Sequence, residues 1–140
     1  MTTTAPATVA DAIDAFGVDV LDHLDRDIAI PVLAGPQRQG DVIVLPRRGA
    51  AANTAVPAAG HPVVRGEAGG NTHLLLASGP VTFDPAAPSA TNLALGVLTV
   101  PDGAVAYLAH PEHGYLGVAP GRYVISRQRE QADLVRMVAD

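Results

Sequence analysis

The sequence predicts one mainly β domain, a small barrel or sandwich, with an amphipathic α-helix at its N-terminal end. Three observations support this fold class. A chain of 140 residues can build one hydrophobic core and is too short for two. Its first 28 residues carry a helical apolar period, and the rest alternates short apolar runs with turn residues. The predicted organisation is therefore an acidic helix over residues 1–28 and a β domain over residues 29–140.

The N-terminal helix is predicted from an N-cap and a periodic apolar face. Thr8 is the candidate N-cap, and the face that follows comprises Val9, Ile13, Phe16, Val20 and Leu24. Four acids fall on the opposite face: Asp11, Asp14, Asp22 and Asp25. Gly17 interrupts the pattern, and a split of the helix into two short helices is an alternative at this residue. We expect the apolar face to pack on a sheet with the acids in water, the alternative being an acidic docking face for a basic partner.

Short apolar runs bounded by glycine and proline predict the strands. They cover residues 28–33, 42–45, 62–65, 73–77, 81–83, 93–100, 104–109, 116–118 and 123–127. Pro101-Asp102-Gly103 predicts a hairpin turn, since proline presets φ and glycine accepts a left-handed conformation. Residues 47–60 predict a long loop, either a lid, an intersubunit arm or a slack linker. The tail, residues 133–140, is compatible with a last strand or a short helix.

Composition restricts the partners of the chain. Charged residues make up 16% of it and apolar residues 48%, whereas about 25% charged is usual. So little charge favours burial against a second copy, and we expect a homo-oligomer, a dimer or trimer. A net charge of −5 argues against nucleic-acid binding. With no signal-peptide pattern and no apolar run of about 18 residues, we expect a cytoplasmic protein without a membrane partner.

Two histidine-bearing turns are the candidate metal site. One is the segment Gly66 to His73, and the other places His110, Glu112 and His113 within four residues. If the turns met at one end of the domain, imidazole and carboxylate groups would together suit a divalent metal such as Zn, Fe, Mn or Ni. The spacing matches no strong metal motif. The alternative is that these are polar turn residues, some of them buried at a subunit contact.

The last predicted strand carries a candidate interface. Tyr123, Arg127 and Arg129 share one face of it because side chains alternate along a strand. That face begins apolar and ends in two guanidinium groups, which is typical of a strand that leaves the core and enters an interface. Anion binding by Arg127 and Arg129 is the alternative.

No pattern in the chain supports enzyme catalysis. The absence of cysteine and lysine removes thiolate and Schiff-base chemistry. Ser78, Ser89 and Ser126 lack the context of a nucleophile elbow. The glycines from Gly66 to Gly70 match neither a P-loop nor a dinucleotide fingerprint.

The motifs of residues 40–140 resemble a group of short uncharacterised bacterial and phage-encoded β-domain proteins. The resemblance rests on GDVIVLP, GEAGGNTH, the His-x-Glu-His turn and the closing Arg127-Gln128-Arg129-Glu130. In that group the middle turn carries paired histidines, and Asn71 stands here in place of the first, leaving His73. The resemblance implies a compact β domain and names no activity.

We therefore expect a non-enzymatic structural or protein-interaction module that forms a homo-oligomer, as a component of a larger or phage-derived assembly. The second hypothesis is a metal-binding or metal-dependent β domain that uses His73, His110, Glu112 and His113. The third is an anion or small-ligand binder that uses Arg127 and Arg129.

Overall fold

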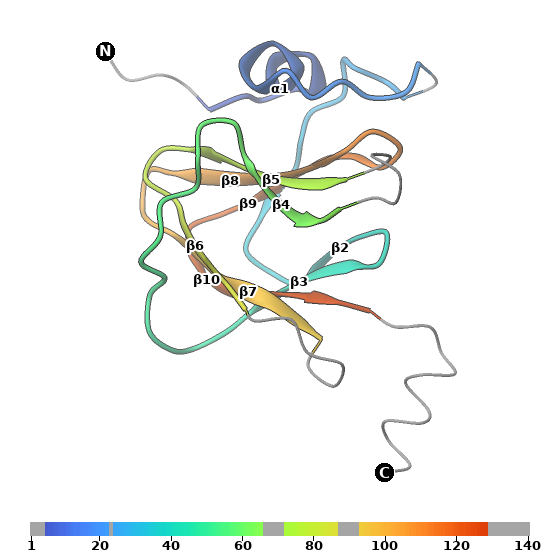
Figure 1. Ribbon diagram of the computed structural model, residues 1–140. Helices are drawn as coiled ribbons and strands as arrows, with labels where there is room; N and C mark the ends of the chain where they lie inside the picture. Colours follow the sequence, from blue (N-terminus) through green and yellow to red (C-terminus); the bar gives the residue numbers. More distant parts are fainter. Residues whose placement is uncertain (1–4, 23, 66–71, 87–92, 129–140) are drawn as a thin grey trace.

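The computed structural model describes residues 5–22, 24–65, 72–86 and 93–128. They form two five-stranded sheets that face each other, with one short helix on the outside (Figure 1). In chain order the elements are α1 (Val9–Phe16), β1 (Val32–Leu33), β2 (Gln37–Gln39), β3 (Val42–Pro46), β4 (His61–Val64), β5 (His73–Ser78), β6 (Thr82–Pro85), β7 (Ala94–Val100), β8 (Val105–His110), β9 (Gly114–Val118) and β10 (Gly121–Arg127). The fold is a sandwich, one of the two predicted architectures, and the predicted barrel alternative is wrong because the two sheets do not close on each other.

Each sheet combines strands that follow each other in the chain with strands that are distant in sequence. The first sheet has the order β1-β9-β8-β5-β4, and the second has the order β2-β3-β10-β7-β6. Every pairing is antiparallel except that of β1 with β9. The predicted Pro101-Asp102-Gly103 turn joins β7, in one sheet, to β8, in the other, so it links the two layers instead of closing a hairpin.

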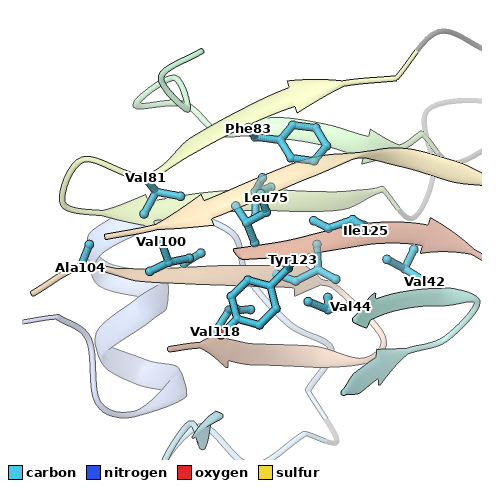
Figure 2. Packing of buried hydrophobic residues seen from close by; sticks show 13 residues of the cluster. Val42, Val44, Leu75, Val81, Phe83, Val100, Ala104, Val118, Tyr123 and Ile125 are labelled. Carbon is cyan, nitrogen blue, oxygen red and sulfur yellow. The ribbon is translucent and has the colours of Figure 1, made fainter. Parts of the chain in front are cut away.

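The main core lies between the sheets and is built from alternating positions of facing strands (Figure 2). Val42 and Val44 of β3 face the same layer as Tyr123 and Ile125 of β10. Leu75 of β5 faces them from the other sheet. Side chains alternate between the two faces of a strand, so every second residue of these predicted apolar runs enters the core.

The first sheet is buried on both faces because α1 and its flanking segments cover the outer one (Figure 1). In β8, Ala106 and Leu108 belong to the core between the sheets, whereas Tyr107 and Ala109 pack toward α1. The Tyr107 hydroxyl donates to the Pro6 carbonyl at 2.7 Å. Burial on both sides explains why this run is continuously apolar in sequence.

The predicted helix over residues 1–28 is wrong in length: α1 ends at Phe16. Thr8 caps it as predicted and forms a capping box with Asp11. Gly17 then takes a left-handed conformation, with φ of 77°, and its N–H donates to the Ile13 carbonyl. Val20 lies in irregular backbone and still packs in the same apolar cluster as Val9 and Ala12 of α1. Its helix-like spacing in the sequence therefore reflects shared burial and not a continued helix.

Two further predictions need correction. Of the predicted run 28–33, only Val32–Leu33 is a strand, and Ala29 forms an isolated bridge to Thr8. β2, which reads Gln-Arg-Gln, was not predicted, since it lacks an apolar period and lies at the edge of its sheet. Residues 47–60 are largely irregular, as predicted, and the tail from 133 to 140 lies outside the described residues. Within the described residues no helix has the length and apolar character required to cross a bilayer.

Candidate functional site

Three histidines that are distant in sequence meet at one end of the sandwich. His73 opens β5, His110 ends β8, and His113 lies in the turn between β8 and β9. Their ring centroids are 4.3 Å apart for His73 and His110, 4.6 Å for His110 and His113, and 6.1 Å for His73 and His113. His73 and His110 are buried, and His113 is exposed. We call these three residues the histidine cluster.

Glu112 does not join the histidine cluster. Its side chain is exposed. Within the described part of the chain its carboxylate forms neither an ion pair nor a hydrogen bond with the three imidazoles. Glu67 and Asn71, in the other predicted turn, lie outside the described residues.

Gln39, which sequence reasoning missed, fixes the ring of His73. Its Nε2 atom donates to the backbone carbonyls of Leu108 at 2.9 Å and Gly114 at 3.1 Å. Its Oε1 atom is thereby turned toward Nδ1 of His73, 2.9 Å away. Since that oxygen can only accept, Nδ1 of His73 carries a proton. The remaining ring nitrogen, Nε2, holds the lone pair of the neutral imidazole.

That lone pair faces a carboxylate. The His73 Nε2 atom lies 3.5 Å from Oδ1 of Asp41, which lies in the turn between β2 and β3. The other carboxylate oxygen, Oδ2, lies 3.5 Å from Nε of Arg127 at the end of β10. Asp41 therefore sits between a buried imidazole and a guanidinium, one from each sheet.

Burial keeps His73 neutral. It lowers the pKa of His73 from 6.5 to about 4, and the neighbouring His110 and His113 act in the same direction. Asp41 opposes the shift without cancelling it. At neutral pH two electron-pair donors, the imidazole Nε2 and the carboxylate Oδ1, therefore face each other across 3.5 Å.

His110 is held in the opposite tautomer. Its Nδ1 atom accepts from the backbone N–H groups of Glu112 at 3.1 Å and His113 at 3.3 Å. The neutral ring then carries its proton on Nε2. In this arrangement His110 folds the turn that presents His113 and offers no ring lone pair to a ligand.

Gly40 leaves the space in which His113 approaches His73. Its φ of +59° is a left-handed conformation that favours glycine. A Cβ atom at this position would lie 3.0 Å from Nε2 of His113 and 3.5 Å from Cε1 of His73. A Cβ here would therefore only touch His73, whereas the His113 ring would have to shift away from this turn.

The arrangement holds a pair of ligand atoms and not yet a complete set. Among the described residues, no group of three histidine, aspartate or glutamate side chains converges as a ready metal site. His73 and Asp41 are in place, and His113 is exposed beside them. His113 would have to turn toward these two groups to form a set of three.

The predicted interface residues separate in the structure. Tyr123 is 2% exposed, and its hydroxyl donates to the Ala119 carbonyl at 2.7 Å, so it packs within this chain. Arg127 is exposed and forms the ion pair with Asp41. Arg129 lies outside the described residues.

The site residues Gln39, Asp41, His73, His113 and Arg127 all lie within one family match. No curated protein and no solved structure matches the chain. A family model described as a domain of unknown function, DUF8820, matches residues 38–128, which run from β2 to the end of β10. The chain belongs to the DUF8820 domain family.

Proposed function

We propose that this protein is a metal-binding β-sandwich domain that holds a divalent transition-metal ion with His73, Asp41 and His113. The observation that carries the proposal is the pair formed by Nε2 of His73 and Oδ1 of Asp41, two electron-pair donors that face each other at 3.5 Å. A cation between two such atoms turns an unfavourable contact into two favourable ones.

The separation of the pair suits a shared metal ion. Ligand atoms that each lie about 2.1 Å from a tetrahedral metal ion are about 3.4 Å apart. The 3.5 Å between His73 and Asp41 is close to this value and long for a hydrogen bond.

The surroundings of His73 resemble those of a metal-bound histidine. Such histidines donate their second ring N–H to a carbonyl, a carboxylate or a water, which fixes the tautomer and the direction of the lone pair. Here the side-chain oxygen of Gln39 takes that role for Nδ1 of His73. Arg127 contacts Oδ2 of Asp41, so that Oδ1 remains directed at His73.

His113 supplies the third ligand in this proposal. Its exposed ring lies beside Gly40, on the same side as His73, and can turn toward the pair without unfolding a strand. Two imidazoles and one carboxylate form a set that binds Zn²⁺, Fe²⁺ or Mn²⁺ and leaves coordination positions open.

The test measures metal stoichiometry and affinity. Untagged full-length protein is stripped of metal with a chelator, dialysed and titrated with Zn²⁺ and Mn²⁺ by calorimetry. Native mass spectrometry counts the ions bound per chain. We expect one ion per chain, and at least about tenfold weaker binding in Asp41→Asn and His113→Gln.

Two variants control for charge and position. Asp102→Asn removes a carboxylate at the turn before β8, and Glu112→Gln removes the one next to His113. Both should bind as the unchanged protein does. The proposal fails if the stripped protein takes up no stoichiometric metal, or if Asp102→Asn weakens binding as much as Asp41→Asn.

A second candidate function, self-association as a structural module, is favoured by exposed apolar side chains near β1. Val32 is 41% exposed, Leu33 is 48% exposed, and Ile28, just before them, is 55% exposed. β1 is an edge strand, and edge strands offer backbone groups to another chain. A second copy that covers this segment would extend the first sheet, in line with a part in a larger or phage-derived assembly.

Light scattering across a range of protein concentrations tests self-association. We expect a dimer or trimer that dissociates in the double variant Val32→Ser/Leu33→Ser. Leu21→Ser is the matched control, because Leu21 is similarly exposed at 42% and lies outside this segment. A monomer at every concentration removes this candidate.

A further inference from the structure

We propose that the opposite end of the sandwich binds an oxyanion, a phosphate or carboxylate group of a small molecule, with Arg47, Arg48 and Arg122. These residues line a hollow of about 360 Å³, whose other walls include Ala34, Pro46 and Pro120. A volume of this size falls within the range of small-molecule pockets. This site is independent of the proposed metal site.

Strand pairing forces two of these arginines together. Tyr123 of β10 is paired with Pro46 of β3. The next residues, Arg122 and Arg47, are therefore opposed, and the Arg47 N–H donates to the Arg122 carbonyl at 2.9 Å. Side chains of directly opposed residues lie on the same face, and like charges in such positions are destabilising. An anion bound between them would remove this repulsion.

In the part of the chain that the structure describes, no acid lines this hollow to neutralise its arginines. The chain carries a net charge of −5 and nine basic residues, all arginine. Within the described residues, ion pairs involve Arg26 and Arg127 and none of the three arginines of the hollow. Among the residues that the structure describes, the lining of the hollow includes no aspartate or glutamate.

A smaller hollow of about 240 Å³ shares the three arginines and does contain an acid, Asp84. Both carboxylate oxygens of Asp84 accept from backbone N–H groups, those of Asn53 and Thr54. These hydrogen bonds lower the pKa of the Asp84 carboxyl group, and the one from Asn53 has the largest effect. Its negative charge disfavours an anion there, so we place the ligand in the larger hollow.

Arg122 is held in position to bind. Its guanidinium donates to the Gly49 carbonyl, which ties the start of the 47–60 loop to β10. A guanidinium with one N–H engaged still presents others in the planar arrangement that matches phosphate and carboxylate oxygens. The apolar side chains of Ala34, Pro46 and Pro120 favour a ligand that carries a hydrophobic group beside its anion.

The distance from the histidine cluster keeps the two sites apart. β3 runs from Val42, next to Asp41, to Pro46, next to Arg47. A strand of five residues spans about 17 Å. Loss of metal binding therefore should leave anion binding unchanged, and the reverse should also hold.

The experiment titrates chelator-treated full-length protein with inorganic phosphate, phenyl phosphate and benzoate at constant ionic strength, followed by amide chemical shifts in NMR. We expect saturable shifts around Arg47 and Arg122, with phenyl phosphate tighter than inorganic phosphate. Saturation by benzoate with little response to phosphate would identify a carboxylate ligand, and the reverse a phosphate ligand. Arg47→Gln and Arg122→Gln should each weaken binding at least about tenfold.

Arg65→Gln is the matched control, since Arg65 is exposed and lies outside the hollow. It should bind as the unchanged protein does. The proposal is overturned if none of the three probes saturates, or if Arg65→Gln reduces binding as much as Arg122→Gln. Asp41→Asn, which tests the metal site, should leave the anion titration unaltered.

Discussion

The Oε1 atom of Gln39 lies 2.9 Å from Nδ1 of His73. This contact links β2, an edge strand of one sheet, to the first residue of β5, an interior strand of the other. The same amide donates to the carbonyls of Leu108 and Gly114, so its orientation is determined by three contacts. One buried amide therefore couples the two sheets and sets the tautomer of the histidine that faces Asp41.

Replacement of this amide should damage stability and metal binding together. Gln39→Leu keeps the approximate volume but removes the side-chain donor to two carbonyls and the acceptor of the buried imidazole N–H, which should lower the free energy of unfolding by about 2–4 kcal/mol. Metal affinity should fall about 10–100-fold, as is usual for the loss of such a partner. Urea denaturation and calorimetry measure the two effects. Gln37→Leu is the control, because Gln37 also donates to a carbonyl, that of Gly117, away from the histidines.

Gly40 should matter more than its backbone conformation alone requires. Gly40→Ala and Gly103→Ala both place a side chain at a positive φ, which costs about 1–2 kcal/mol in each. A Cβ at Gly103 has open space around it, whereas one at Gly40 meets His113. Metal titration should therefore show weaker binding in Gly40→Ala alone. Equal affinity in the two variants would rule out a role for this close approach.

The stability of the metal-free protein should fall as the pH drops from about 6.5 to about 4. His73 has a folded pKa of about 4 and an unfolded value of 6.5, so the unfolded chain takes up a proton in this interval before the folded chain does. The contribution is on the order of 3 kcal/mol, and below pH 4 it changes no further. Urea denaturation at each pH measures it, and NMR of the ring should show His73 uncharged at pH 5. A His73 ring that titrates near 6.5 would contradict the prediction.

Alkaline pH should unfold the chain before its tyrosines ionise freely. All three hydroxyls donate to backbone carbonyls, Tyr107 to Pro6, Tyr115 to Val18 and Tyr123 to Ala119. Burial raises the pKa of each, that of Tyr115 to about 12. The unfolded chain loses these protons near pH 10 and the folded chain does not, so stability falls as the pH rises above 10.

Tyrosine absorbance in the ultraviolet tests this behaviour. In the native protein the phenolate signal should rise together with loss of the circular dichroism signal, whereas in guanidinium chloride it should rise near pH 10. A native phenolate signal near pH 10 without unfolding would show that at least one hydroxyl is accessible to solvent.

Local chemistry determined most of the strands and the start of the helix. Thr8 caps α1 as predicted, and the structure adds a capping box with Asp11, because capping depends on residues three apart in sequence. β3, β7, β8 and β10 lie where apolar runs between turn residues predicted them. Such signals act over a few residues and therefore survive in the sequence alone.

The set of residues around His73 could be identified only from the tertiary structure. The sequence pointed to His73, His110 and His113 through their turns, and it also pointed to Glu112, which remains outside the cluster. Gln39 and Asp41 carry no local signal, since they become partners of His73 only when β2 and β3 of one sheet pack over β5 of the other. Similarly, Arg47 and Arg122 meet through the pairing of β3 with β10, across 75 residues of chain. Periodicity indicates which face of a strand is buried, whereas the pairing and packing of strands decide which distant side chains meet.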